Sequence, residues 1–522
     1  MPAPLPPGLS ARDLDRALTA FASVVSDDWV LAADADRASY VDNFAVQDDA
    51  HLAAAAVAPV SAEEVQAIVR LANEHRVPLW PISRGKNFGY GGPAPELTGS
   101  VVLDLTRMKR IEIDEENGTA LVEPGVGFYD LYDHLEANQI PLWMSVPGNS
   151  WGSVAGNALD RGVGYTTYGD HTSKICGLEV VTPTGDLVRT GMGAMANAPT
   201  WQLYRYGFGP AWDQMFVQSN FGVVTKLGLW LMPEPESMLG FDFEFDRPDD
   251  LEWVVDTLAP LRREGILQQA PSVGNWLRAA AVLTRRQEWT DDPGPLSDAV
   301  IDAIRERFNI GWWGFSTRFY GPLEVTEATS RVVERAFNGR SVLVMNRARW
   351  EQGQPREQSA WAGVPLTFPL QNANWHGGRG GHMGFSPALP ANGRLALEQF
   401  RRTYARYTEY GMDYHASFAL GERHLTNVNQ VLFNKDDPAM MGRIDGFFRT
   451  LVADASERGY GEYRTHLDYM DLVAQSYDFN DGALLRLNET VKDALDPNGV
   501  IAPGKSGVWP ARYRDRGFGS DA

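Results

Sequence analysis

The chain has 522 residues, 44% of them hydrophobic, which is enough apolar material for more than one buried core. A formal net charge of -20 disfavours nucleic acid as a partner, because phosphate binding needs a basic surface. No segment offers the ~20 uninterrupted apolar residues of a membrane-spanning helix, and the proline-rich start is not typical of a signal peptide, so we expect a cytoplasmic protein without membrane association.

The first predicted elements alternate between strand and helix. Residues 53–59 form a short apolar stretch typical of a strand. Ser61 and Glu64 match a capping box, which predicts a helix with Val65, Ile68 and Ala72 on one face. Apolar stretches at 79–82 and 100–105 predict two further strands, and the loop between them carries glycine at positions 85, 89, 91 and 92.

This glycine-rich loop is a candidate phosphate site. Glycine lets the backbone approach a ligand closely and adopt positive φ, so successive N–H groups can converge on a phosphate. The spacing matches neither GxGxxG nor a Walker A loop, and the next element is a strand where a Rossmann unit needs a helix. We therefore expect loop amides to hold a diphosphate; the alternative is a surface turn rich in glycine. The candidate cofactor contacts are Ser83, Arg84, Gly85, Lys86, Asn87, Gly89 and Gly91.

A second glycine-dense segment follows a predicted strand at 120–124 and a predicted helix at 129–137. Glycine recurs there at positions 148, 152, 156, 162 and 164. Two such segments suggest a long, flat ligand held along its length. The candidate contacts in this segment are Ser153, Gly156 and Asn157.

Three residues point to a phenolic ligand: Tyr90 in the first glycine loop, and the adjacent Tyr463 and Arg464. A phenol ionises near pH ~10 in water. Two hydrogen-bond donors and a permanently charged guanidinium would favour its phenolate by stabilising the charged form. The sequence alone does not establish that the three residues meet.

Residues 376–387 carry two histidines in a glycine-rich run that predicts neither helix nor strand packing. An imidazole such as that of His382 can act as a nucleophile near neutral pH, and the alternative is a loop histidine without a function. The nine histidines are otherwise scattered, without an HxxxH pair or a carboxylate companion, so we expect no metal site.

The pattern changes near residues 233–236, which predicts a domain boundary. Helices are predicted at 252–262, 297–308, 327–337, 395–407 and 438–457, with strands at 312–319, 342–347 and 414–420. Helices packed on an antiparallel sheet would form a cap domain. After about residue 460 the chain is expected to return to the first domain.

Long segments of the chain resemble the vanillyl-alcohol oxidase family, also called the p-cresol methylhydroxylase (PCMH) type. They are residues 153–166, 168–171, 189–194, 218–226, 463–466 and 496–507. The resemblance points to the 4-alkylphenol branch. It implies an α+β, two-domain PCMH-type FAD-binding fold, with the FAD-binding domain at 1–236 and 460–522 and an antiparallel-sheet-plus-helices cap domain at 237–459.

The resemblance also implies roles for individual residues. In that family the residues matching Tyr90, Tyr463 and Arg464 bind the substrate phenolate. His382, which precedes Phe-Ser-Pro, matches the histidine joined covalently to the 8α carbon of FAD. Lys505 is a further candidate FAD contact. The candidate substrate-pocket residues are Gly148, Trp151, Ser386 and His415.

One departure from the family concerns the catalytic base. Many 4-alkylphenol oxidases carry an aspartate in a Pro-Asp-Leu-Gly segment beside the reactive carbon, and this chain has Gly148 there. The change removes a local base and is expected to leave more space above the substrate, so the choice between hydroxylation and desaturation stays open.

We therefore expect a FAD-dependent oxidase of 4-alkylphenols, 4-allylphenols or 4-hydroxybenzyl alcohols. A benzylic hydride would pass to flavin N5 through a p-quinone methide, giving alkenylphenol, hydroxylated product or aldehyde, and dioxygen would become hydrogen peroxide. One alternative is a flavocytochrome-type dehydrogenase, whose branch couples flavin through tyrosine. The other is a phenol-binding flavoprotein without turnover. A homo-oligomer, dimer or octamer, is also expected.

Overall fold

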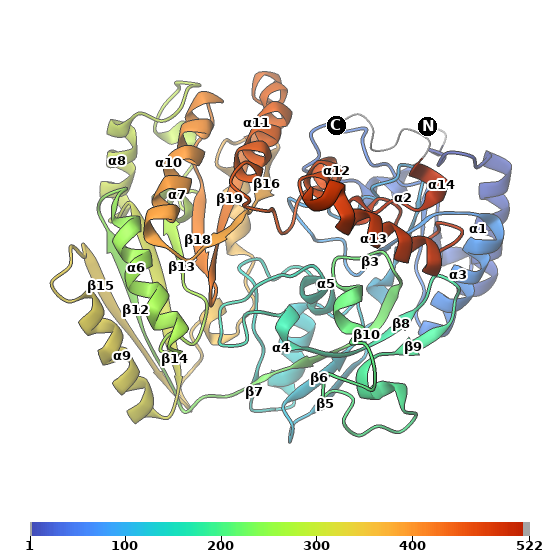
Figure 1. Ribbon diagram of the computed structural model, residues 1–522, viewed down its shortest axis with the longest axis horizontal. Coiled ribbons are helices and arrows are strands. Elements are labelled where there is room, and N and C mark those ends of the chain that lie inside the picture. Colours follow the sequence, from blue (N-terminus) through green and yellow to red (C-terminus); the bar gives the residue numbers. More distant parts are fainter. Residues whose placement is uncertain (1–2, 515–522) are drawn as a thin grey trace.

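The strands of the computed structural model, which describes residues 3–514, assemble into four sheets (Figure 1). The first is a small sheet in the order β1 (Val30–Leu31), β2 (Ala55–Val57), β4 (Val101–Asp104) and β3 (Leu79–Ile82). Strands β2, β4 and β3 are parallel. The helix α3 (Ala62–His75) crosses from β2 to β3, and α1 (Ala11–Val25) packs against it.

The predicted start of α3 is confirmed. The Ser61 side chain accepts a hydrogen bond from the Glu64 amide, and Val65, Ile68 and Ala72 are buried. The Glu64 carboxylate accepts from the Val60 amide at 2.7 Å. The Ser61 half of the predicted capping box is therefore present, whereas the Glu64 carboxylate bonds to the amide one residue before the N-cap rather than to the Ser61 amide.

The second sheet is antiparallel and has five strands. Their order is β5 (Ile111–Asp114), β6 (Thr119–Val122), β10 (Val223–Trp230), β8 (Ile175–Val181) and β9 (Leu187–Arg189). The helices α4 (Phe128–Ala137) and α5 (Val154–Leu159) lie between its strands in the chain, and β7 (Leu142–Trp143) pairs with β11 (Met232–Pro233). Helix α5 lies within the second glycine-dense segment, and Gly156 is in this helix.

The C-terminal segment returns to the first sheet, as expected. The Leu79 amide donates to the Val500 carbonyl at 2.7 Å, and the Ala502 amide donates to the Leu79 carbonyl at 2.8 Å. The helices α12 (Met470–Gln475) and α13 (Phe479–Leu495) lie beside the N-terminal part in Figure 1. This return brings residues 463–505 to the glycine-rich loop.

The cap consists of an eight-stranded antiparallel sheet with helices on its outer face. The strand order is β15 (Val344–Glu351), β12 (Ser237–Phe245), β14 (Trp313–Gly321), β13 (Ser272–Asn275), β18 (Ala416–Leu420), β19 (His424–Asn434) and β16 (Gly380–Phe385), and β17 (Ala388–Pro390) pairs with β19. The cap helices are α6 (Asp250–Arg263), α7 (Trp276–Ala280), α8 (Asp298–Phe308), α9 (Leu323–Phe337), α10 (Gly393–Glu409) and α11 (Pro438–Ser456).

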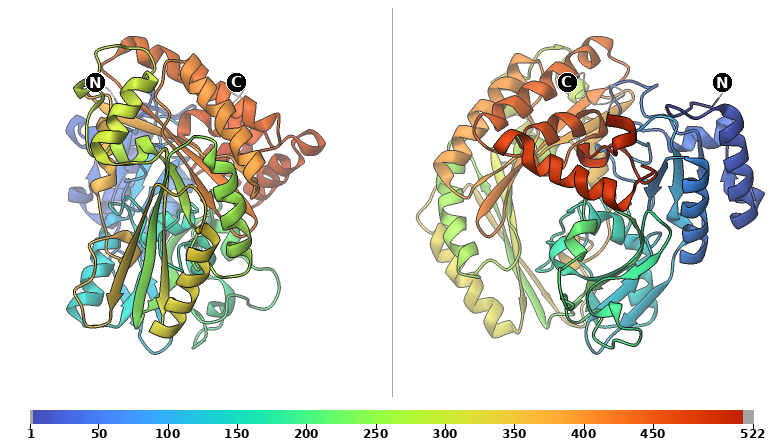
Figure 2. Two further views of the ribbon diagram at one scale, coloured as in Figure 1. Left: turned by 90° about the vertical axis from the view of Figure 1, so that its left-hand side faces the viewer. Right: turned by 45° about the vertical axis from the view of Figure 1, so that its right-hand side comes forward.

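Figure 2 shows helices of the cap on the side of its sheet that faces away from the N-terminal part. Alternate residues of β18 and β19 point the other way and line a cavity: Ser417, Ala419, Thr426, Val428 and Gln430. Their neighbours Phe418 and Leu425 are buried in the core of the cap. The period of two therefore separates a core face from a ligand face. The residue limits of the two domains stay predictions.

Candidate active site

A cavity of about 1380 Å³ lies between the N-terminal part and the inner face of the cap sheet. It is lined by fourteen of the residues singled out from the sequence: Ser83, Gly85, Lys86, Asn87, Tyr90, Gly148, Ser153, Gly156, Asn157, His382, His415, Tyr463, Arg464 and Lys505. The remaining five, Arg84, Gly89, Gly91, Trp151 and Ser386, do not line it.

Tyr90, Tyr463 and Arg464 meet in this cavity. The Arg464 guanidinium carbon lies 3.9 Å from the centroid of the Tyr90 ring and 5.9 Å from that of Tyr463. Asp160 accepts from Arg464 through its backbone carbonyl at 3.3 Å, and its carboxylate is 3.8 Å from Nη1. The guanidinium thus lies close to two phenol rings and forms an ion pair with Asp160.

The backbone around this cluster is fixed from three directions. The Gln218 side chain donates to the Tyr463 carbonyl at 3.0 Å. The neighbouring Glu462 carboxylate accepts from the Ser386 amide on the cap, at 2.7 and 2.8 Å. The Tyr90 amide donates to the Asn87 carbonyl at 3.1 Å, in a turn where Gly89 and Gly91 have φ of 79° and 110°. These positive values explain the glycines of this loop.

The protonation states suit an anion between these side chains. Burial raises the pKa of Tyr463 to about 12, against the opposing effect of Arg464, so its hydroxyl keeps a proton to donate. Burial alone would lower the pKa of Arg464, but Tyr90, Tyr463 and Asp160 together hold that pKa above its ordinary value. The cluster therefore offers a fixed positive charge and a hydroxyl donor.

His382 lies in the strand β16, so the expectation that its glycine run packs in no strand was wrong. His382 pairs with Leu432 of β19. The glycines are needed because neighbours approach the strand closely. A Cβ at Gly381 would lie 2.5 Å from Phe433, and one at Gly384 would lie 2.3 Å from the Tyr90 hydroxyl. The glycines around His382 thus let β16 pair with β19 where neighbouring groups leave no room for a side chain.

The His382 side chain is 5% exposed and packs against Phe44, with ring centroids 5.1 Å apart and the rings tilted by 58°. Its Nδ1 is buried without a hydrogen-bond partner among the described residues. Burial lowers the pKa of His382 to about 4, so the ring is neutral near pH 7. A neutral imidazole that lines a cavity and has an unpaired nitrogen suits a bond to a ligand.

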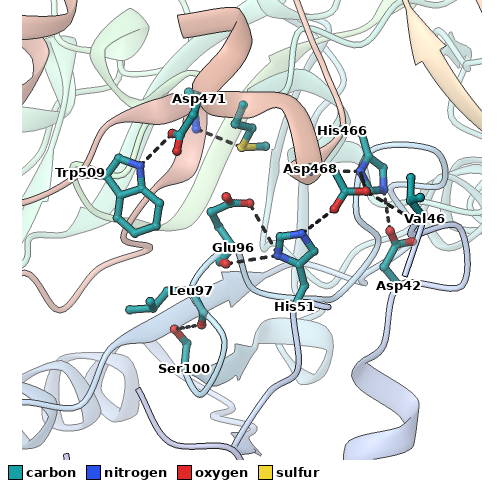
Figure 3. Close-up of polar contacts among 12 residues, drawn as sticks. Asp42, Val46, His51, Glu96, Leu97, Ser100, His466, Asp468, Asp471 and Trp509 are labelled. Atoms are coloured by element: carbon teal, nitrogen blue, oxygen red, sulfur yellow. Dashed lines mark hydrogen bonds and ion pairs between the residues drawn. The ribbon is translucent and has the colours of Figure 1, made fainter. Parts of the chain in front are cut away.

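The Phe44 amide donates to Asp42 at 2.9 Å, and Asp42 begins a buried chain of ionisable groups (Figure 3). His466 Nε2 lies 2.6 Å from Asp42, and its Nδ1 lies 3.3 Å from Asp468. His51 Nε2 lies 2.8 Å from the other oxygen of Asp468. Burial opposes charge on both histidines, but hydrogen bonds to these carboxylates outweigh it and raise the pKa of each to about 9. His466 is therefore a structural ion-pair partner.

The glycine-rich segments fit a flat, phosphate-bearing cofactor such as FAD. A Cβ at Gly156 would lie 2.4 Å from the Ser83 hydroxyl, and one at Gly89 would lie 2.7 Å from the His382 ring. The first glycine loop and the start of α5 therefore approach as closely as glycine permits. The Ser153 hydroxyl accepts from the Gly156 amide at 2.8 Å and begins α5. FAD would lie along these segments, with His382 at one end.

Asp160 links several candidate residues and was missed in the sequence. It accepts from the Asn87 side chain at 2.9 Å and from Lys505 at 3.4 Å, in addition to its contact with Arg464. Asn87 and Lys505 are thus oriented by this carboxylate. No local sequence pattern predicts this role for Asp160, because its partners are at least 73 residues away along the chain.

The five candidates outside the cavity lining have other contacts. Arg84 pairs with Asp130 at 2.7 Å, where Asp130 also caps α4. Trp151 is 46% exposed. Ser386 is buried, with its hydroxyl unpaired. The two glycines, 89 and 91, lie where a Cβ would strike the His382 and Leu467 side chains.

The space beside Gly148 is filled, so the expectation of more room was wrong. A Cβ at Gly148 would lie 3.0 Å from the Tyr165 hydroxyl. Arg278 donates to that hydroxyl at 3.0 Å and to the Ser272 hydroxyl at 2.7 Å. His415 also lines the cavity, and both of its ring nitrogens are buried without a hydrogen-bond partner in the part of the chain that the structure describes. Burial, assisted by Arg278, lowers the pKa of His415 to about 3.

Across residues 3–514, no group of three or more histidine, cysteine, aspartate or glutamate residues is placed to hold a metal ion. Within the same residues, no helix combines the length and apolar character that crossing a bilayer demands.

Comparison with known proteins identifies the family. Residues 53–191 match the FAD binding domain, and residues 318–506 match the C-terminal domain of FAD linked oxidases. The chain is 37% identical over 515 residues to the 4-cresol dehydrogenase (hydroxylating) flavoprotein subunit of Pseudomonas putida, covering 97% of each chain. It belongs to the 4-alkylphenol family of FAD-dependent oxidoreductases.

Two solved structures support this assignment to the 4-alkylphenol family. The isoeugenol complex of 4-ethylphenol oxidase from Gulosibacter chungangensis is 36% identical, with a TM-score of 0.93 and coverage of 98% of this chain and 100% of that one. Substrate-bound p-cresol methylhydroxylase is 35% identical, with a TM-score of 0.92 and coverage of 97% and 99%. The predicted PCMH-type fold is therefore confirmed.

Proposed function

We propose that this FAD-dependent oxidoreductase is an oxidase of para-substituted phenols, which it holds as phenolates between Tyr90, Tyr463 and Arg464. The observation that carries the proposal is that the Arg464 guanidinium lies close to the Tyr90 and Tyr463 rings in the cavity. The substrates would be 4-alkylphenols, 4-allylphenols or 4-hydroxybenzyl alcohols. Such a cluster is suited to an aromatic anion, because it offers a fixed cation, apolar ring faces and a hydroxyl donor.

The bound FAD would supply the acceptor for a benzylic hydride and deliver both electrons to dioxygen, giving hydrogen peroxide. The residues of the chain act on the substrate. Arg464 and Tyr463 hold the oxygen as phenolate, which makes the ring electron-rich and lets the benzylic carbon lose hydride as the substrate becomes a neutral p-quinone methide. Holding the phenolate is therefore the main catalytic task of this cluster.

His382 would hold the cofactor through a covalent bond to the flavin 8α carbon. Its neutral ring, its unpaired Nδ1 and its place at the cavity support this proposal. In the rival flavocytochrome-type dehydrogenase branch the link is made through tyrosine, so a histidine at this position favours the oxidase.

The product would depend on the groups beside the benzylic carbon. Gly148 supplies no base, and the lowered pKa of His415 makes it a weak one. Water addition gives a hydroxylated product and a proton loss from the next carbon gives an alkenylphenol. A 4-hydroxybenzyl alcohol would give the aldehyde. Without a strong local base, we expect alkenylphenol to form a large share of the product.

The test mixes the enzyme with a panel of 4-alkylphenols and measures flavin reduction without oxygen and hydrogen peroxide formation in air. Flavin reduction without oxygen, followed by hydrogen peroxide in air, is the expected result. Reduction without peroxide, but with transfer to a cytochrome or dye, would identify a dehydrogenase. Binding without any reduction would identify a phenol-binding flavoprotein. Sedimentation of the same preparation would test the predicted homo-oligomer.

A further inference from the structure

The cavity is basic, although the chain is strongly acidic. The whole sequence has 47 lysines and arginines against 67 aspartates and glutamates. The described cavity lining has eight lysines and arginines, whereas its acidic residues are Asp160, Asp170 and Glu422. The diphosphate of FAD and one phenolate would balance part of this charge. The remainder points to a ligand with a further negative charge.

Arg278 lines the cavity beside Tyr165, which faces Gly148. Arg278 lies on α7 of the cap and donates to the Tyr165 hydroxyl. A Cβ added at Gly148 would lie 3.0 Å from that hydroxyl. Among the described residues the hydrogen-bond partners of Arg278 are the hydroxyls of Tyr165 and Ser272, and it forms no ion pair with a described carboxylate. A guanidinium has five N–H groups, so three of them remain available.

His415 supplies a second unused group at the same place. Its side chain is 5% exposed and lines the cavity, yet both of its ring nitrogens lack partners among the described residues. A buried polar group without a partner is costly, so it indicates a ligand or water that is bound there. A neutral imidazole with one N–H and the remaining N–H groups of the Arg278 guanidinium together match a carboxylate, which accepts up to four hydrogen bonds.

We propose that Arg278 and His415 bind a carboxylate on the para chain of the substrate, which makes 4-hydroxyphenylalkanoates the preferred class. The proposal rests on the proposed function, because it takes Tyr90, Tyr463 and Arg464 as the anchor at the phenol end. The substrate carboxylate would then supply the negative charge that an aspartate supplies in relatives and that Gly148 lacks. Tyr165 holds Arg278 in place through its hydroxyl.

The first test compares acids with their neutral isosteres on the wild-type holoenzyme. The acids are 4-hydroxyphenylacetate and 3-(4-hydroxyphenyl)propanoate, and the isosteres are their primary amides. We measure anaerobic flavin reduction and take the limiting rate and the Kd from its dependence on substrate concentration. At least one acid should exceed its amide by about 10- to 100-fold in the ratio of rate to Kd, mainly through Kd. Equal values for both pairs would overturn the proposal.

The second test uses variants. Arg278→Gln should lower this ratio for the preferred acid at least tenfold more than for its amide, and Arg278→Lys should restore part of the loss. Arg285→Gln is the matched control, because Arg285 is outside the cavity lining and contacts Thr284 and Gln371. Equal losses for acid and amide in Arg278→Gln would contradict the proposal. 4-Ethylphenol separates the two failures: if it also fails to reduce the flavin, the proposed function is wrong, and if it alone succeeds, only the carboxylate site is wrong.

Discussion

Replacing Arg464 by alanine should raise the pKa of a bound phenol. In the native protein the guanidinium carbon lies 3.9 Å from the centroid of the Tyr90 ring. A phenolate bound beside Tyr90, Tyr463 and Arg464, as proposed, would lie about 4 Å from this fixed positive charge. The cation favours the ionised form of the ligand, which lowers the pKa of the bound phenol. Removing the cation therefore shifts that pKa upward.

The size of the shift follows from the surroundings of Arg464. Two unit charges about 4 Å apart interact by about 4 kcal/mol at an effective dielectric constant near 20. The side chain is 17% exposed and faces Asp160, which reduces this interaction. We therefore expect a loss of about 1.5–3 kcal/mol, in the range of a charge-assisted hydrogen bond. That loss corresponds to about one to two pKa units and to roughly 10- to 150-fold weaker phenolate binding.

The assay is a pH titration of a bound phenol that lacks a benzylic hydrogen, such as 4-bromophenol, followed by its phenolate absorbance. Tyr463→Phe and Tyr90→Phe should shift the pKa in the same direction by less, since each removes a neutral group. Arg464→Lys is the control for charge, and it should keep most of the native pKa. Unchanged ionisation in Arg464→Ala and in both phenylalanine variants would place the anchor elsewhere.

Three further predictions concern the cofactor, the product and stability. Acid-precipitated wild type should keep its flavin while His382→Ala releases FAD; complete release from the wild type would disprove the covalent bond. Gly148→Asp should move the products of 4-ethylphenol from alkenylphenol towards the alcohol, because a positioned base is worth about 10²–10⁴-fold. Chromatography decides this, with Tyr165→Phe added to relieve the contact at 3.0 Å. Asp468→Asn should weaken the pH dependence of the free energy of unfolding. The pKa of His51 and of His466 is raised to about 9, so their contribution to stability is complete below about pH 6.5 and is lost as the pH rises through 9. Urea unfolding across this range should show a falling free energy in the wild type and a lower, flatter one in the variant.

Local patterns predicted the regular elements well, because each pattern has a local physical cause. Ser61 predicted the start of α3 through a bond to an amide three residues away. The stripes of α8 and α10 were predicted from apolar spacing, and Ile301, Ile304, Leu397 and Phe400 are buried. These signals need no knowledge of distant contacts. The helix and strand limits differ from the expected ones by a few residues.

The sequence was less informative where distant segments decide the structure. The glycine run around His382 predicted a loop, but it forms β16 because Phe433 and the Tyr90 hydroxyl come close enough to exclude side chains. The role of Asp160 depends on partners in three separate segments. The room expected at Gly148 is taken by Tyr165, which a cap residue, Arg278, holds in place. No local periodicity records such contacts.

The two parts of the chain contribute different groups to the cavity, and this division has a consequence for specificity. Tyr90 follows the first sheet and Tyr463 and Arg464 lie in the returning C-terminal segment, whereas Arg278 lies on α7 and His415 precedes β18. If the proposed sites are right, the phenol end and the para chain would be recognised by separate elements, and substitutions around α7 and β18 would change the preferred para chain without disturbing the phenolate anchor. His382 is also on the cap, so a bond from it to FAD would fix the cap relative to the anchor. Precise spacing between the two ends of the substrate would then depend on the cofactor itself.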